Sequence, residues 1–377
     1  MRKSSIYLHY PYCLKKCNYC DFVSFACDGK VEDLLNFYLK ELNLSFQHFG
    51  RRKISSIYFG GGTPSLMSVE MVDKILERIC TLFDVDVDAE ITLEVNPKTM
   101  NAQKFYDFSI AGVNRISVGV QSFDDDELRF LGRVHTLDDA RKTLDFAGKY
   151  FSNISADFIY AIPGQTLEKW QKNLEEIAKL DVNHLSLYQL IIEPKTKFYS
   201  LVKNGKIEPV SEMLAKKMYE YTNRFLKGKF NQYEISNYAK LGFESRHNLN
   251  YWDGGDYIGV GVSAAGRIFD GKKHFITENP KTMDAWKKQV EMGTLSMRIL
   301  PKNKRAEEMI IMGLRKNKGI NFKEFQNNSG VDFFTLIDMK KFQNMVQKKF
   351  LISCESSVRA SFKGRSVLDA IIREIIK

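Results

Sequence analysis

The sequence predicts an α/β protein built on a parallel sheet and followed by a small second module. Through the first two thirds of the chain, short runs of β-branched and aromatic residues alternate with segments of helical periodicity. Repeated βα units are typical of a parallel sheet, either doubly wound or curled into a full or partial barrel, and the pattern alone leaves these arrangements open. A chain of 377 residues, 44% of them hydrophobic, can bury such a core.

The predicted strands and helices follow one another in regular order. A short apolar strand precedes the first cysteines, and five more strands are expected at residues 54–59, 90–95, 115–120, 154–159 and 184–190. Helical patterns cover residues 68–82, 99–111, 124–131, 137–150, 166–180 and 211–227. Several begin at Ser, Thr or Asp, whose side-chain oxygen accepts hydrogen bonds from the free N–H groups of a first helical turn.

A change of composition after Pro280 predicts a separate module. Just before it, residues 253–266 are rich in glycine, which indicates backbone packed closely against a neighbour. Beyond it, lysine-rich helical patterns recur around residues 309–314, 322–325 and 333–350, with a short turn at 361–365. We therefore predict a core of residues 1–290 that holds the functional sites and a basic helical or winged-helix module of residues 291–377.

The net charge of +10 is concentrated in the second module, where 17 basic residues face 9 acidic ones. Such an asymmetry can mark contact with nucleic acid, an anionic membrane surface or an acidic partner. The charges are interspersed rather than blocked, so an ordinary solvated surface explains them at least as well, and a nucleic-acid partner is not expected. With no membrane-length apolar stretch, no signal-peptide core and six cysteines that make no disulfide scaffold, we expect a cytoplasmic protein.

Three cysteines near the N-terminus have a spacing that indicates a metal cluster. Cys13, Cys17 and Cys20 form a Cys-x3-Cys-x2-Cys pattern. Three thiolates on one loop can hold three irons of a [4Fe-4S] cluster and leave the fourth iron open to another chelator. Structural zinc would need two further ligands with their own spacing, and nearby His9 supplies only one. The remaining cysteines are scattered singly and are interpreted as buried or idle thiols: Cys27, Cys80 and Cys354.

Polar and glycine residues follow the ends of several predicted strands. The strip of residues 60–64, Gly-Gly-Gly-Thr-Pro, lets backbone amides approach a ligand, although a tight strand-to-helix turn would also explain it. Glu94, Gln121 and Asp157 lie at strand ends, where βα barrels place functional groups. Each side chain could accept hydrogen bonds from ribose hydroxyls or an ammonium group, or equally cap a helix.

The cysteine loop and the glycine strip together resemble the radical S-adenosylmethionine (SAM) superfamily. Further motifs occur in order along nearly the whole chain and are similar to the oxygen-independent coproporphyrinogen III oxidase family. They are residues 7–13, Tyr19, residues 60–64, 94–97, 119–122, 131–135 and 157–165. The resemblance implies a partial (β/α) TIM-like radical SAM barrel. It also implies that Ala161 stands where the family more often has glycine.

Position by position, the resemblance implies two neighbouring cofactors. Cys13, Cys17 and Cys20 would bind the [4Fe-4S] cluster, and SAM would chelate the free iron. The residues expected around SAM are Tyr7, Tyr19, Gly61, Gly62, Thr63, Glu94, Gln121, Arg133 and Asp157. Glu94 would face the ammonium group of SAM and Arg133 its carboxylate, which the planar guanidinium fork suits.

The family divides into true oxidases and a heme-chaperone branch called HemW, and three features favour the second. Oxidases resemble Cys-x3-Cys-x2-Cys-x-Cys, whereas the last position here is Phe22. Oxidases also carry a sizeable segment before the cysteines, whereas only twelve residues precede Cys13. Finally, residues 247–252, His-Asn-Leu-Asn-Tyr-Trp, resemble the His-Asn-x-x-Tyr-Trp motif of the HemW branch. His247 is therefore a candidate axial ligand of heme iron, or else a hydrogen-bonded core residue.

These observations predict a heme chaperone that binds heme, the cluster and SAM and transfers heme to an acceptor protein. The resemblance implies respiratory hemoproteins at the membrane as acceptors, a possible homodimer, and a basic module that approaches an anionic surface. The alternative is an oxygen-independent coproporphyrinogen III oxidase, which forms protoporphyrinogen IX by oxidative decarboxylation; we expect that activity to be absent. Radical-based modification of RNA has only the charge asymmetry in its favour.

Overall fold

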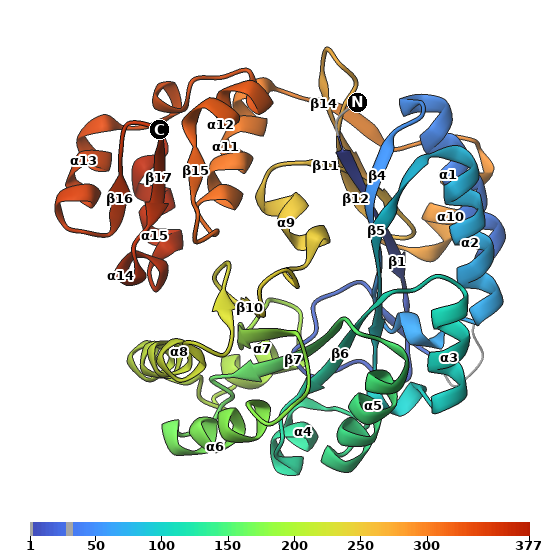
Figure 1. Ribbon diagram of the computed structural model, residues 1–377, viewed down its shortest axis with the longest axis horizontal. Coiled ribbons are helices and arrows are strands. Elements are labelled where there is room, and N and C mark those ends of the chain that lie inside the picture. The colour runs from blue at the N-terminus through green and yellow to red at the C-terminus, as the bar shows by residue number, and fades with distance from the viewer. Residues whose placement is uncertain (1–2, 28–32) are drawn as a thin grey trace.

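The fold is a large mixed sheet curled into an open barrel, with helices on its outer face (Figure 1). The computed structural model describes residues 3–27 and 33–377. Within them, the sheet has the strand order β14-β13-β12-β11-β1-β4-β5-β6-β7-β8-β10-β9. Its strands are β1 (Lys3–Tyr10), β4 (Lys53–Gly61), β5 (Asp84–Val95), β6 (Arg115–Gln121), β7 (Ile154–Tyr160), β8 (His184–Gln189), β9 (Asn231–Gln232), β10 (Asn237–Ala239), β11 (Asp256–Val260), β12 (Ala265–Phe269), β13 (His274–Glu278) and β14 (Met297–Leu300).

The strands from β11 and β1 through β8 pair in parallel and form the wall of the barrel. Apolar residues such as Phe59, Val118 and Phe158 are fully buried, as expected of parallel strands covered on both faces. The helices of this part are α1 (Leu35–Phe49), α2 (Val69–Leu82), α3 (Ala102–Ile110), α4 (Asp125–Leu131), α5 (Leu137–Tyr150), α6 (Leu167–Ile177), α7 (Lys197–Lys203), α8 (Glu212–Leu226), α9 (Arg246–Trp252) and α10 (Met283–Glu291). The predicted α/β class and partial barrel are confirmed.

Local chemistry explains where many helices begin. Ser68 accepts a hydrogen bond from the third residue of α2, and Thr166 does the same for α6. At the start of α5, Thr136 and Asp139 satisfy each other's backbone N–H groups as a capping box. By contrast, α1 follows Leu34, which has no capping side chain, and the sequence pattern did not predict this helix.

The C-terminal module packs helices around a small antiparallel sheet and has its own hydrophobic core. Its elements are α11 (Lys302–Gly313), β15 (Ile320–Asn321), α12 (Phe322–Ser329), η3 (Phe333–Leu336), α13 (Met339–Gln347), β16 (Leu351–Ser353), β17 (Ser357–Ala360), α14 (Phe362–Arg365) and α15 (Leu368–Ile375). The helix expected over residues 333–350 is divided, because Asp338 caps a new helix. The boundary after residue 290 stays a prediction; β14 still pairs with β13 of the large sheet.

Helix α9 lies between the barrel and the module, contacting β1, β4 and β11 on one side and α11 on the other (Figure 1). Arg305 of α11 reinforces this arrangement by donating hydrogen bonds to the carbonyl groups of Gly254 (2.5 Å) and Gly255 (3.2 Å). Among the helices of the described residues, none has the length and apolar character that crossing a membrane requires.

Candidate functional site

A cavity of about 580 Å³ opens at the carboxyl ends of the parallel strands. The cavity is lined by all thirteen residues that the sequence predicted as ligands of the cluster, SAM or heme. They come from β1 and the cysteine loop after it, from the ends of β4, β5 and β6, from the middle of β7, from the segment after α4, and from α9. Residues more than 200 positions apart in the chain therefore meet in one cavity. Their roles as ligands stay predictions.

The cysteine loop is held in place by hydrogen bonds at both of its sides. The backbone N–H of Asn18 donates to the carbonyl of Leu131 (3.0 Å), and the Asn18 amide donates to Phe130 (2.7 Å). On the other side, Nε2 of His9 lies 2.8 Å from the carbonyl oxygen of Val23. These contacts fix the loop to β1 and to the end of α4, so the three thiols share a rigid frame.

The chemistry of the three thiols fits a cluster. Burial raises the pKa of Cys13, and it raises the pKa of Cys20 to about 11. Both thiols are therefore protonated at neutral pH until a metal displaces the proton. All three thiols line the same cavity. Three thiolates on one loop can hold three irons of a [4Fe-4S] cluster.

The glycine strip ends β4 directly against the cysteine loop. The backbone N–H of Gly62 donates to the carbonyl of Tyr10 at 2.6 Å. A Cβ atom on Gly62 would lie 2.7 Å from the carbonyl oxygen of Tyr12 and 3.0 Å from Sγ of Cys13. Gly61 has a φ of +111°, which side chains rarely adopt. Glycine is therefore required at these positions because the cysteine loop packs directly against them, whether or not a ligand also binds there.

Two carboxylates line the middle of the cavity. The Tyr58 hydroxyl donates to Glu94 at 2.8 Å, while Asp157 accepts from Ser117 (2.8 Å) and Ser155 (3.1 Å). Burial, together with the neighbouring charge of Asp157, raises the pKa of Glu94 to about 7, and burial raises the pKa of Asp157. Two acidic groups in one enclosed space suit a cationic ligand, whose charge would keep them ionised.

Arg133 and Gln121 reach the cavity from neighbouring segments. Arg133 donates through Nη2 to the carbonyl of Gly119 (2.9 Å) and through Nη1 to Sγ of Cys17 (3.4 Å). Gln121 ends β6 at a change of register between β6 and β7, with a φ of +72°. Such a bulge redirects a side chain out of the strand, here toward the cavity.

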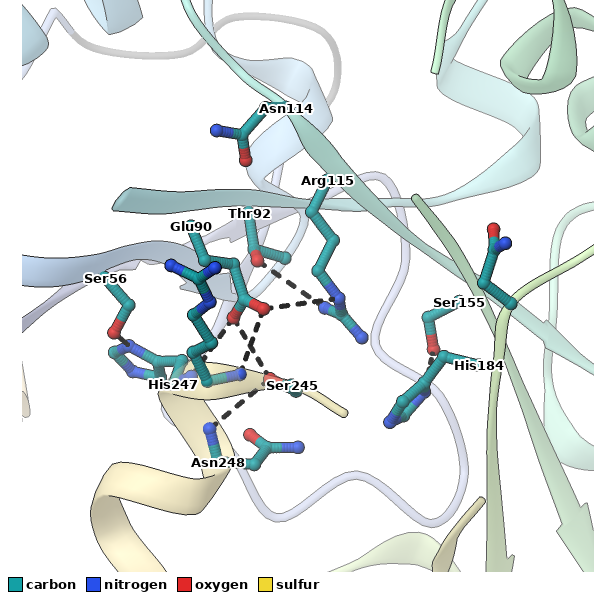
Figure 2. Close-up of polar contacts among 12 residues, drawn as sticks. Ser56, Glu90, Thr92, Asn114, Arg115, Ser155, His184, Ser245, His247 and Asn248 are labelled. Atoms are coloured by element: carbon teal, nitrogen blue, oxygen red, sulfur yellow. Dashed lines mark hydrogen bonds and ion pairs between the residues drawn. The ribbon is translucent and has the colours of Figure 1, made fainter. Parts of the chain in front are cut away.

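A buried polar network, of which Arg115 and His247 also line the cavity, was not predicted from the sequence (Figure 2). The Glu90 carboxylate accepts hydrogen bonds from the backbone N–H groups of Arg246 (3.0 Å) and His247 (3.1 Å) and from the Ser245 hydroxyl (3.2 Å). Arg115, which is 2% exposed, lies 3.9 Å from the same carboxylate. Glu90 therefore holds the N-terminus of α9 to the barrel wall. The available signal was a charged residue at the start of each of two predicted apolar strands, 90–95 and 115–120.

His247 is 1% exposed and makes contacts of its own beside this network. Its Nδ1 lies 3.0 Å from the Ser56 hydroxyl, and its Nε2 lies 2.9 Å from the Tyr251 hydroxyl. Its ring stacks on Tyr58 at a centroid distance of 4.8 Å. Burial, aided by the positive charge of Arg115, lowers the pKa of His247 to about 3, so the imidazole is neutral. A neutral imidazole is the form that binds metals.

Comparison with protein families agrees with this site. Residues 7–177, which include the cysteine loop and the glycine strip, match the Radical SAM superfamily model. Residues 300–367 match the model of the HemN C-terminal domain. Both parts of the chain are thus similar to parts of known families.

Full-length relatives extend the similarity. The chain is 36% identical to radical S-adenosyl methionine domain-containing protein 1, mitochondrial, of Danio rerio, over 99% of this chain and 87% of the relative. It is 34% identical to heme chaperone HemW of Lactococcus lactis, over 96% and 94% respectively. Coproporphyrinogen III oxidase (HemN) from Escherichia coli shares the fold, with a TM-score of 0.81 and 22% identity over 99% of this chain and 89% of the other. The chain belongs to the radical SAM superfamily and, within it, to the HemN-like family, with full-length relatives named heme chaperone HemW.

Proposed function

We propose that the protein is a heme chaperone that uses a [4Fe-4S] cluster and SAM and passes heme to an acceptor protein. The observation that carries the proposal is Phe22, an aromatic side chain 61% exposed at the cavity, where the oxidase pattern has a fourth cysteine. The cofactor residues remain while this oxidase thiol is replaced by an apolar surface. Full-length relatives named heme chaperone HemW also support the heme-chaperone proposal.

The residues around the cavity each have a part in this function. Cys13, Cys17 and Cys20 would hold the cluster, which can supply one electron to SAM when both are bound. Glu94 would bind the ammonium group of SAM, and its own hydrogen bond from Tyr58 fixes its orientation. Arg133 would bind the carboxylate, since its fork already points into the cavity and its contact with Cys17 is long enough to be exchanged.

Heme would be held near α9, with the neutral imidazole of His247 as axial ligand. Aromatic rings of Tyr58 and Tyr251 lie beside it and suit a flat apolar macrocycle. The basic C-terminal module would help the loaded protein approach an anionic surface where an acceptor resides, and a homodimer is a further element of the proposal. We propose a reducing compartment, the cytoplasm, although relatives include proteins named as mitochondrial.

Two assays on anaerobically reconstituted protein test the proposal. Titration with hemin is expected to give a saturable change in the visible spectrum. Incubation with coproporphyrinogen III, SAM and a reductant is expected to leave the porphyrinogen unchanged. Steady formation of protoporphyrinogen IX would instead establish the oxidase, and a Cys17→Ala variant, which should lose the cluster, provides the control for any cofactor-dependent turnover.

A further inference from the structure

The hydrogen bonds around His247 favour one position for the proton of its imidazole ring. The Ser56 hydroxyl donates its single proton to the Ser5 hydroxyl at 2.7 Å. With the Ser56 proton directed to Ser5, the Ser56 oxygen accepts from Nδ1 of His247, 3.0 Å away (Figure 2). This direction favours the Nδ1–H tautomer of the neutral imidazole, with its lone pair on Nε2.

That lone pair faces the hydroxyl of Tyr251. The two residues lie four positions apart on α9, so their side chains share one face of the helix. The Tyr251 hydroxyl lies 2.9 Å from Nε2, and because Nε2 carries no proton, the tyrosine is the donor. Both side chains line the cavity. The nitrogen best placed to bind a metal is thus covered by one hydroxyl group.

The parts of this arrangement differ in how firmly they are held. The backbone of His247 is fixed by Glu90, and its ring is fixed by Ser56 and by stacking on Tyr58. Metal-binding histidines commonly donate their other N–H to an orienting partner in this way, which fixes the tautomer. The Tyr251 ring packs edge-on against Tyr257, at a centroid distance of 4.6 Å, and only its hydroxyl bonds to the imidazole.

We propose that Tyr251 is a removable cap on a preset metal ligand: heme iron binds Nε2 of His247 when the whole Tyr251 side chain swings away, because its hydroxyl oxygen lies 2.9 Å from Nε2 and leaves no room for iron. The inference rests on the proposed heme function and deepens it. The step is an exchange in which one O–H···N hydrogen bond breaks and one N–Fe bond forms from the Nε2 lone pair. The proton stays on the tyrosine, and no electron is transferred.

The tautomer can be measured without heme. In the full-length protein labelled with ¹⁵N-histidine, the Nδ1 resonance of His247 is expected at a protonated position and Nε2 at an unprotonated one, with His247→Gln providing the assignment. An Nε2–H tautomer would overturn the inference, because the nitrogen said to bind iron would then carry the proton.

Hemin titration then tests the cap itself. Tyr251→Phe retains the ring and removes the competing hydrogen bond, so its affinity for hemin is expected to rise about 2- to 10-fold, as loss of one neutral hydrogen bond implies. The matched control is Tyr257→Phe, which removes a hydroxyl from the adjacent ring and should leave affinity unchanged. In the His247→Gln/Tyr251→Phe double variant the gain should disappear.

The outcomes separate the two proposals. If the parent protein binds hemin and Tyr251→Phe binds it equally well or less well, or if the gain persists without His247, the cap is wrong and the proposed function stands. If neither the parent protein nor Tyr251→Phe binds hemin, the proposed function is wrong, and the cap is overturned with it.

Discussion

Ala161 and Gln121 both lie in the left-handed backbone region, with φ of +58° and +72°. For residues other than glycine this conformation costs about 1–2 kcal/mol, and it is concentrated at functional sites. The departure at Ala161, where the family more often has glycine, thereby has a physical explanation: the position requires a conformation that glycine adopts freely. Gln121 faces the cavity from such a position, which is consistent with its predicted contact with SAM.

Much of the lining of the cavity could be predicted from the sequence, whereas the buried residues that hold this lining in place could not. The cysteines, glycines and strand-end polar residues have recognisable spacing or position. Glu90 and Arg115 do not, because their role depends on contact between β5, β6 and a helix some 155 residues further along the chain. A local pattern cannot reveal which distant N-terminus a buried carboxylate will cap.

The role assigned to Glu94 leads to a prediction for SAM binding. Glu94→Gln keeps an oxygen that can accept from Tyr58 but loses the negative charge. Because hydrogen bonds to charged groups contribute about 1.5–3 kcal/mol, affinity for SAM is expected to fall roughly 10- to 100-fold in calorimetric titrations of reconstituted protein. Glu193→Gln, at the same cavity, is the control. Equal losses in both variants would argue against a specific contact with Glu94.

At the scale of elements, a cap helped to predict the starts of the longer helices, whereas the short helices α7 and α9 were not predicted although Thr196 and Ser245 cap them. The expected and observed boundaries of α5 coincide at residues 137–150, where Thr136 and Asp139 form the capping box. Helix α1 has no such cap, and the antiparallel extension from β12 to β14 consists of short strands whose pairing depends on tertiary contacts. The glycine-rich segment before them provides close backbone packing, as expected, with Gly261 beside the carbonyl of His9.

The junction of β4 with the cysteine loop gives a second prediction. In Gly62→Ala, the added methyl group would overlap the Tyr12 carbonyl and crowd the Cys13 thiol, so the loop must shift. We expect a clear decrease in bound iron and acid-labile sulfide after reconstitution. Gly148→Ala, on the open surface of α5, should retain full cluster content. A full content of iron and sulfide in Gly62→Ala would show that the cysteine loop can shift without losing the cluster.

At the scale of the whole molecule, Glu41 connects three distant segments. Its carboxylate accepts from the backbone N–H of Gly261 (2.8 Å), the Asn279 amide (2.5 Å) and the Trp286 indole (2.8 Å). It thereby joins α1 to the segment after β11 and to α10. The sequence order predicted a parallel sheet with outer helices, but these links lie between residues more than 200 positions apart and leave no local pattern.

Glu41 also predicts how stability depends on pH. Burial raises its pKa from 4.5 to about 7 in the folded protein. Between these values the folded state keeps the proton that the unfolded state releases, so the contribution to stability present below pH 4.5 is lost as the pH rises through 7. The change is at most about 3 kcal/mol, at 1.36 kcal/mol per pKa unit.

Chemical denaturation of the parent protein and of Glu41→Gln at pH 5 and pH 8 measures this effect. The difference in the free energy of unfolding between the two proteins removes the contributions of other buried acids, because both proteins share them. Relative to the parent protein, the glutamine variant is expected to be more stable at pH 8 than at pH 5. Parallel stability curves would show that the three hydrogen bonds keep the carboxylate ionised throughout.

The end of α9 has one more consequence. Trp252 is half-buried, with the guanidinium of Arg315 from the C-terminal module 5.1 Å from its ring centroid. The other two tryptophans, Trp170 and Trp286, are sealed in the interior with their indole N–H groups bonded to Thr222 and Glu41. The molecule therefore has a native fluorophore at the contact between the barrel and the C-terminal module. A change in the emission of Trp252 would report a movement of one against the other without any attached dye.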